Sequence, residues 1–134
     1  MPRVMLDWRQ RGFAKPPDFC HAPKGGLLVF RAWGAGSSEW GSGYFSLQKP
    51  ESVLDAEWRF NIADWGNGIH FVTTFRIKES VGFYKGPVGH ARRDLSRRGT
   101  QIYLETPFVH MIEKVGTSEV LRHDAFVSPK AGEA

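Results

Sequence analysis

The sequence predicts an α+β fold built on a mainly antiparallel, split or two-layer β-sheet with few helices. Polar and apolar residues alternate from Ile69 to Lys78, which is the period-two pattern of a strand with one buried face. Other short apolar or aromatic runs lie between glycines and prolines, whereas a single segment has helical features. Strands and helices do not alternate regularly, and 134 residues hold too few crossover helices for a doubly wound parallel sheet.

The composition fits one compact domain over residues 1–134. With 41% hydrophobic and 13% aromatic residues, the chain has enough apolar side chains for a single core. Cys20 is the only cysteine, which rules out an intramolecular disulfide and a zinc site of four thiolates. The sequence contains neither an N-terminal signal pattern nor an apolar run of membrane-spanning length, so we expect a soluble chain without a membrane span.

The charge balance is modestly basic. The chain has 18 Lys and Arg against 14 Asp and Glu, a net charge of +4, which favours an anionic small molecule or an acidic protein as the partner. The basic residues are scattered except for one cluster in segment 91–98, made of Arg92, Arg93, Arg97 and Arg98. Stacking aromatic residues are not interleaved with this cluster, so it is interpreted as a basic loop and no nucleic-acid partner is expected.

The N-terminal part predicts two short strands around a glycine-rich turn. Residues 1–25 contain several prolines and are interpreted as an irregular or partly helical lead-in. Residues 27–30 form a continuous apolar run suited to a buried strand, with Arg31 where that strand emerges. Four glycines between residues 34 and 43 then predict a turn, and residues 44–47 a second strand.

The middle of the chain predicts one helix and the clearest strand. A helix over about residues 50–60 is favoured by a proline in its first turn, a glutamate near its positive end and recurring apolar residues. Segment 64–68 has the asparagine and glycines of a turn. A strand over residues 69–77 follows, and its alternation places His70 on the face opposite the phenylalanines.

The C-terminal part predicts further short strands around the basic loop. Glycine and proline residues punctuate this part, and the basic segment has no clean periodicity. Strands are expected over residues 81–84, 100–105 and 108–115, with a final short strand pair over 119–127 and a flexible polar tail over 128–134.

Several well-known catalytic patterns are missing from the sequence. The chain has neither the G-x-S-x-G elbow of serine hydrolases nor the glycine patterns of dinucleotide-binding and P-loop proteins. The five histidines lack the paired spacing of a helical zinc site, so no metal is expected. His70 is the histidine with the best claim to contact a substrate, because a polar cleft could lie on its face of the strand. The alternative is that His70 is structural or faces solvent.

A discontinuous set of residues remains, and its order resembles a known family. The set runs from Arg31 through Ser38-Glu39-Trp40-Gly41, Tyr44-Phe45-Ser46, Phe75-Arg76-Ile77 and Gly86-Pro87 to Gly99-Thr100-Gln101-Ile102-Tyr103. In this order, over roughly residues 27–105, the chain resembles the tuberculosis necrotizing toxin family of NAD glycohydrolases.

The resemblance implies a compact ADP-ribosyltransferase-like fold that hydrolyses NAD or NADP to nicotinamide and ADP-ribose or its phosphate. It implies that Arg31 and Gln101 are catalytic and that Tyr44 is the aromatic binding residue. NAD or NADP would be the substrate, with no further cofactor. Members are commonly the toxic C-terminal domain of larger secreted proteins. The resemblance therefore also implies delivery into the cytoplasm of a target cell, interbacterial competition and a cognate immunity protein.

The residue types suit this reaction. Nicotinamide is a good leaving group, and its departure leaves an oxocarbenium-like ribose that water can capture, so the protein has mainly to position and polarise. We expect Arg31 to bind the pyrophosphate or the nicotinamide-side ribose and Gln101 to orient a ribose hydroxyl or water. Substrate contacts are expected from Tyr44, Ser46 and His70. The structural alternative is that Gln101 hydrogen-bonds within the sheet while Arg31 forms a surface ion pair.

Two other functions stay open. A mono-ADP-ribosyltransferase would use Glu105, or another acid, to direct an acceptor, whereas the neutral amide of Gln101 favours hydrolysis. A non-enzymatic module would use the glycine-rich and aromatic surface to bind a partner protein.

Overall fold

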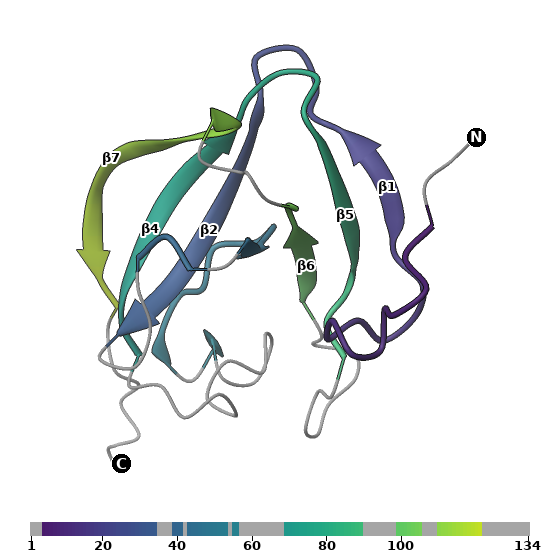
Figure 1. Cartoon of the computed structure of the whole chain (residues 1–134). Coiled ribbons are helices and arrows are strands. Elements are labelled where there is room, and N and C mark those ends of the chain that lie inside the picture. The colour runs from purple at the N-terminus through teal and green to yellow at the C-terminus, as the bar shows by residue number, and fades with distance from the viewer. Residues whose placement is uncertain are drawn as a thin grey trace.

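Seven β-strands form the framework of the part of the chain that the structure describes and account for about half of its residues (Figure 1). This computed structural model describes residues 4–34, 39–41, 43–53, 55–56, 69–89, 99–105 and 110–121. The strands are β1 (Asp18–His21), β2 (Leu27–Gly34), β3 (Tyr44–Ser46), β4 (Ile69–Ile77), β5 (Gly82–Pro87), β6 (Thr100–Tyr103) and β7 (Ile112–Val120). The only α-helical residues in these ranges are Val53, Asp55 and Ala56.

The strands form one sheet in the order β1-β5-β6-β3-β2-β4-β7, and every neighbouring pair is antiparallel. Its two halves diverge in Figure 1, with β7, β4 and β2 on the left and β6, β5 and β1 on the right. The three-residue strand β3 joins them, because Ser46 lies opposite both Phe30 of β2 and Gln101 of β6. The predicted mainly antiparallel sheet with few helices is therefore confirmed for the described residues.

Two loops also connect the halves, at the top of Figure 1. One leads from β1 to β2 and the other from β4 to β5. They are hydrogen-bonded to each other, since the Ala22 N–H donates to the Val81 carbonyl and the Ser80 N–H donates to the Ala22 carbonyl, both at 2.9 Å. These bonds hold the halves together at this end.

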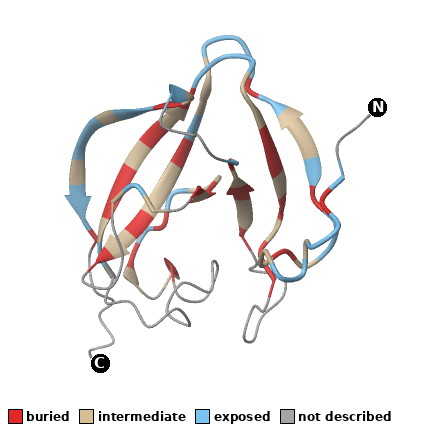
Figure 2. Ribbon diagram, in the orientation of Figure 1, coloured by how far each residue is buried: buried red, intermediate tan, exposed pale blue. Residues whose placement is uncertain are grey.

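The main core lies between the two halves. Side chains alternate across a strand, so each strand contributes every second residue to it. Val29 and Phe75 are paired across β2 and β4, while Phe45 and Ile102 are paired across β3 and β6. Figure 2 shows this alternation as bands of buried and half-buried residues along β2 and β4, whereas β7 is largely exposed. The core residues are Ala22, Val29, Phe45, Phe75, Ile77, Phe83, Ile102, Leu104 and Ile112.

The opposite face of the sheet is covered by two separate apolar clusters. The first packs the lead-in over β5 and β6, and consists of Met5, Phe13 and Tyr84 with Trp8, Phe19 and Tyr103 at its margin. The second lies over β2 and β4, and consists of Ala32, Ala56, Val72 and Leu121 with Phe30 and Val53 at its margin. β3 lies between the strands that carry these clusters.

The structure corrects the prediction in the N-terminal part. β1 lies within segment 1–25, which was predicted to be an irregular lead-in. It is a four-residue strand at the edge of the sheet, too short to give a periodic pattern. β2 continues through Arg31 to Gly34, so Arg31 lies inside a strand and not where one ends.

Strand bounds also differ in the C-terminal part. β5 includes Gly86 and Pro87, which were predicted to close it, and β6 ends at Tyr103. β7 begins at Ile112 and includes residues 119 and 120, which were predicted to start a separate strand pair. The burial of β7 does not alternate, because this edge strand is mostly exposed, and its sequence therefore gave a weak strand signal.

The described part of the predicted helix begins at Ser52. The Asp55 N–H donates to the Ser52 hydroxyl at 3.1 Å, and the Ala56 N–H donates to the Ser52 carbonyl at 3.0 Å, as expected at a capped N-terminus. Residues 57–60 lie outside the described part, as do the predicted turn at 64–68, the basic loop at 91–98, segment 122–127 and the tail at 128–134. None of the helical residues described belongs to a helix long and apolar enough to cross a membrane.

Candidate functional site

Tyr44, Ser46 and Gln101 lie on one face of the sheet, where β3 pairs with β6. Ser46 is directly opposite Gln101, and Tyr44 is directly opposite Tyr103. Residues two apart in a strand point to the same face, so these four side chains form two adjacent rows. The structure thus brings together three residues predicted to contact the substrate, and adds Tyr103.

Arg31 lies on the other face. Phe30 is the β2 residue opposite Ser46, and the next residue along an extended strand points away from that face. The single cluster of Arg31 with Tyr44 and Gln101 that the sequence predicted is therefore not formed. The physical reason is that β2 remains extended through Arg31 to Gly34, so the alternation of side chains continues through this position.

The Arg31 guanidinium packs against the turn at residues 39–41. A Cβ atom placed on Gly41 would lie 2.5 Å from Arg31 Cζ and 2.7 Å from Nε, so only a glycine permits this approach without a shift. Burial lowers the pKa of Arg31, although an arginine remains protonated at neutral pH. Trp40 covers Phe75 in the same region, with ring centroids 4.8 Å apart. Residues 39–41 thus lie over the face that carries Arg31.

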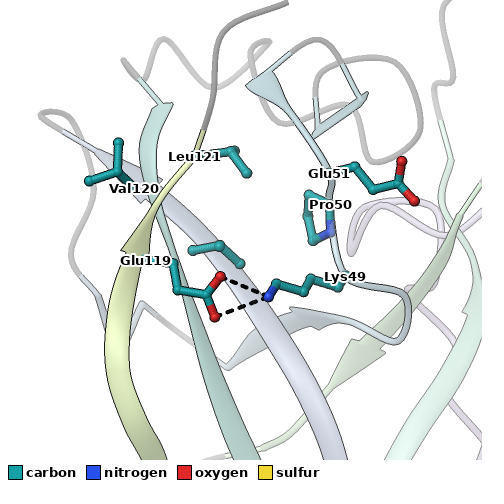
Figure 3. Close-up of a pocket in the computed structure, with 7 residues that line it drawn as sticks. Lys49, Pro50, Glu51, Glu119, Val120 and Leu121 are labelled. Atoms are coloured by element: carbon teal, nitrogen blue, oxygen red, sulfur yellow. Dashed lines mark hydrogen bonds and ion pairs between the residues drawn. The ribbon is translucent and has the colours of Figure 1, made fainter.

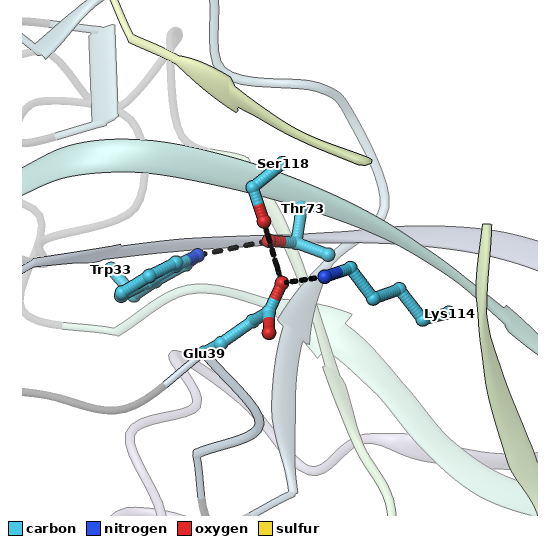
Figure 4. A network of polar contacts seen from close by, with 5 residues as sticks. All are labelled: Trp33, Glu39, Thr73, Lys114 and Ser118. Carbon is cyan, nitrogen blue, oxygen red and sulfur yellow. Dashed lines mark hydrogen bonds and ion pairs between the residues drawn. The ribbon is translucent and has the colours of Figure 1, made fainter. Parts of the chain in front are cut away.

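Glu39 anchors this turn through a polar network (Figure 4). Trp33 Nε1 donates to the Thr73 hydroxyl at 2.9 Å, and that hydroxyl donates to Glu39 at 2.9 Å. Lys114 Nζ lies 2.8 Å from the same carboxylate, and Ser118 also donates to it. Burial alone would raise the pKa of Glu39, but the hydrogen bonds from Lys114, Ser118 and Thr73 outweigh it and hold the pKa below its ordinary value. The network joins the turn to β2, β4 and β7.

The lead-in covers Gln101 and Tyr44 on the opposite face. Gln101 Nε2 donates to the Arg11 carbonyl at 3.0 Å. Arg11 Nη1 donates to the Tyr103 hydroxyl at 3.1 Å, and the Tyr44 and Tyr103 rings lie 4.8 Å apart. A hydrogen bond with Tyr44 is the main cause that raises the pKa of Arg11, while burial raises the pKa of Tyr44. Arg11 was missed because its segment has no regular pattern and lies 90 residues from Gln101.

Ser46 and Glu105 differ in their surroundings. Ser46 is buried, and its hydroxyl donates to the Phe30 carbonyl at 3.2 Å, so it helps to hold β3 against β2. Glu105 is exposed and lies two residues beyond the end of β6. Side chains alternate between the two faces only within a strand. The alternation that would place Glu105 on the same side as Gln101 therefore does not apply to it.

His70 lies away from this cluster. It is exposed, and two strands, β2 and β3, separate β4 from β6. Two consecutive residues of β2 pair with Phe71 and Ile69. His70, which lies between these two in β4, is therefore the extra residue of a β-bulge. A bulge re-aims a side chain, and the alternation used to predict the face of His70 is interrupted at this residue.

A shallow pocket of about 330 Å³ lies elsewhere on the molecule, between residues 49–51 and the end of β7 (Figure 3). Lys49 Nζ bridges both carboxylate oxygens of Glu119 there, at 2.8 and 3.0 Å. Its lining residues are Lys49, Pro50, Glu51, Val72, Glu119, Val120 and Leu121, which include none of the predicted site residues. Among the residues that the structure describes, no group of three or more His, Cys, Asp or Glu could hold a metal ion.

Comparison with known proteins gives a likeness in fold. No protein-family model matches the chain, and no curated protein matches its sequence. A chain of the solved structure of Tne2 in complex with Tni2 superposes with a TM-score of 0.64 at 16% identity, covering 81% of this chain and 94% of that chain. A chain of the complex of Rhs1-CT with its cognate immunity protein RhsI1 gives a TM-score of 0.47 at 16% identity, over 79% and 80% of the two chains. The protein thus shares its fold with a chain of the Tne2–Tni2 complex.

Proposed function

We propose that this chain is an NAD glycohydrolase toxin domain with a compact ADP-ribosyltransferase-like fold, which hydrolyses the nicotinamide–ribose bond of NAD or NADP. The observation that carries the proposal is the direct pairing of Ser46 with Gln101, next to the pairing of Tyr44 with Tyr103, where the two halves of the sheet meet. The order of residues that resembles the toxin family and the likeness in fold to a chain of the Tne2–Tni2 complex support it.

In the proposed reaction Gln101 orients a reactant through its free carbonyl oxygen. Its Nε2 is held by the Arg11 backbone, whereas no donor among the described residues reaches Oε1. An amide oxygen held in this way can accept a hydrogen bond from a ribose hydroxyl or from the attacking water. Nicotinamide leaves with the electrons of the glycosidic bond, water adds to the ribose carbon, and the released proton passes to solvent. The reaction requires no covalent enzyme intermediate.

Tyr44 and Arg31 have different roles in this proposal. Tyr44 lies in the row next to Gln101 and offers an aromatic face and a hydroxyl to the nicotinamide ribose. Arg31 acts from the other face, where it packs under Gly41 and fixes the turn that leads into β3. We therefore assign contact with the substrate to Tyr44 and Gln101, and positioning of β3 to Arg31.

The expected setting is a toxin delivered into a target cell and neutralised by an immunity protein. The solved complex with a chain that shares this fold pairs Tne2 with Tni2. For the present chain we propose an immunity partner of its own, delivery by a larger polypeptide and action on NAD or NADP in the cytoplasm of the target cell.

A binding module without enzymatic activity is the second candidate. One observation favours it: the amide of Gln101 and the ring of Tyr44 have partners within the protein, as purely structural residues would. Such a module would leave NAD intact at any protein concentration.

Incubation of the purified protein with NAD, followed by chromatographic separation of nicotinamide, ADP-ribose and labelled macromolecules, tests these functions. Equal amounts of nicotinamide and free ADP-ribose support the hydrolase. Release of nicotinamide with ADP-ribose attached to an added protein or nucleic acid instead identifies a transferase. No release of nicotinamide would reject both enzymatic functions.

A further inference from the structure

The lead-in brings a cation to the face that carries Tyr44 and Gln101. Arg11 is the arginine in question, since Arg31 lies on the other face. Its side chain reaches Tyr103 and Tyr44, and its backbone carbonyl accepts from Gln101. One residue therefore contacts the predicted catalytic glutamine through its main chain and the neighbouring tyrosines through its side chain.

Arg11 is held in place by its own segment. Phe13, two residues on, is 2% exposed and forms a β-bridge with Val88. The Ala14 N–H donates to the Pro87 carbonyl at 3.0 Å, and the Gly89 N–H donates to the Gly12 carbonyl at 2.6 Å. Gly12 has a φ of 87°, which a glycine adopts without strain and which turns the chain directly after Arg11. The position of Arg11 is thus fixed by packing and by backbone hydrogen bonds.

The guanidinium keeps donors for a further acceptor. A guanidinium has five N–H groups, arranged as a planar fork. Nε donates to Asp7 at 3.0 Å, Nη1 donates to Tyr103 at 3.1 Å, and a further hydrogen bond joins the guanidinium to Tyr44, while the side chain remains 43% exposed. The Tyr103 ring lies 5.2 Å from Arg11 Cζ and supports the fork from one side. The remaining N–H groups of this fork can bind an oxyanion in a bidentate manner.

We propose that Arg11 binds the phosphate groups of the substrate, in one site with Tyr44, Tyr103 and Gln101. This inference rests on the proposed hydrolysis of NAD or NADP and assigns the pyrophosphate, a function first predicted for Arg31, to a residue of the lead-in. Asp7 is the competing anion. Its ion pair with Arg11 is exposed on both sides, at 43% and 45%, and such pairs are weak enough for a phosphate ligand to displace.

Titration with ADP, followed by isothermal titration calorimetry at low salt, tests the anion site apart from catalysis. Arg11→Gln is expected to weaken ADP binding by about tenfold or more, since a charge-assisted hydrogen bond is lost. The matched control is Arg9→Gln, which removes the same charge from an exposed arginine that stacks on Trp8, and it should change affinity by less than about threefold. Asp7→Asn should tighten binding, because it removes the competing carboxylate.

Equal ADP affinity of folded Arg11→Gln and wild type, or no ADP binding by the wild type, would overturn the inference. If Arg11→Gln does not fold, as judged by circular dichroism, Arg11→Lys replaces it. Lysine keeps the charge but loses the fork, so weaker binding of ADP supports bidentate recognition and unchanged binding contradicts it.

The kinetics with NAD separate this inference from the proposed function. Loss of Arg11 should raise KM more than it lowers kcat, because the phosphates are bound equally in the ground and transition states. A wild type that binds ADP through Arg11 but releases no nicotinamide would reject the hydrolase and leave the anion site standing. A wild type that hydrolyses NAD with a KM unaffected by Arg11→Gln would reject the anion site alone.

Discussion

The two ends of the Gln101 amide have different surroundings. Its nitrogen donates to the Arg11 carbonyl at 3.0 Å, whereas no donor among the described residues reaches its oxygen, and both atoms would lie 3.6 Å from a Cβ atom on Gly12. The nitrogen therefore fixes the rotation of the amide, and the oxygen is the atom available to a ligand. Because the nitrogen holds the amide in place and the oxygen can accept a hydrogen bond, a neutral amide at this position is suited to orient water or a ribose hydroxyl.

Thr73 is the polar residue at the centre of the network around Glu39. It is fully buried, accepts from Trp33 and donates to Glu39. Thr73→Val preserves the shape but leaves both partners without this hydroxyl, so we expect the free energy of unfolding to fall by about 1–3 kcal/mol. Urea denaturation measures the loss. Thr74→Val, on the opposite face of the same strand, is the control, and an equal loss in both variants would contradict the network's contribution.

The ionisation of Glu39 predicts a pH dependence of stability. Its pKa is lower in the folded protein than the ordinary value of 4.5, so its carboxylate stabilises the fold above that value, and this contribution is lost as the pH falls through the folded pKa. The difference in free energy of unfolding between wild type and Glu39→Gln should be constant near neutral pH and shrink below 4.5. Denaturation at a series of pH values measures it.

Glu113→Gln is the control for Glu39→Gln. Glu113 forms an exposed ion pair with Arg76 at 3.5 Å, and such a pair contributes little to stability. A stability difference for Glu39→Gln that grows as the pH falls would contradict the assigned direction of the pKa shift.

At the scale of elements, the candidate site depends on the pairing of β3 with its neighbouring strands. Only three residues long, it pairs with β2 on one side and with β6 on the other. Gly43 directly precedes it, with a φ of 101°, and its carbonyl accepts from the Leu104 N–H at 2.8 Å. The entry to β3 is thus fixed by a close approach between two backbones.

Gly43→Ala should separate β3 from β6. A Cβ atom there would overlap the Leu104 carbonyl oxygen, which is main chain and cannot rotate away. We expect a loss of about 1–3 kcal/mol from this overlap, beyond the about 1–2 kcal/mol that alanine costs at a positive φ. Gly116→Ala isolates the second effect, because Gly116 has a φ of 71° and nothing within 4 Å of the added atom. Equal losses in thermal or urea unfolding would contradict the close packing at Gly43.

The strands that could be predicted from sequence are those with a local pattern. β4 contributes Phe75 and Ile77 to the main core, and its alternating sequence predicted a strand over residues 69–77, as observed. β1 and β7 form the edges of the sheet, where one strand is short and the other mostly exposed, so neither shows a clean period. The order of the strands depends on pairings between distant segments, such as β3 with β6, which no local pattern encodes.

The candidate site could be predicted only in part for the same reason. Tyr44 and Ser46 share a face because they are two residues apart, which is visible in the sequence. The face of Arg31 depends on where β2 ends and on its register with β3, and both are tertiary features. Arg11 reaches the site because an irregular segment packs against the sheet. Neither a periodic pattern nor a motif in the sequence predicts this packing.

At the scale of the whole molecule, one face of the sheet holds the main core and the other carries the candidate site. The face between the halves holds the main core and the partly buried network that anchors Glu39, next to the packing of Arg31 against Gly41. The other face carries Tyr44 and Gln101, between strands covered by separate apolar clusters. The net charge of +4 favours an anionic ligand for the molecule as a whole, in keeping with a dinucleotide substrate.

The rate of nicotinamide release from NAD by wild type, Gln101→Ala and Gln10→Ala, measured side by side on folded protein, tests the central claim most directly. Gln10 is an exposed glutamine of the lead-in and controls for the loss of an amide. We predict that the wild type and Gln10→Ala release nicotinamide at similar rates, and that Gln101→Ala is slower by about a hundredfold or more, as when a positioning group of an active site is removed. Full activity of Gln101→Ala, or no activity of the wild type, would contradict the account.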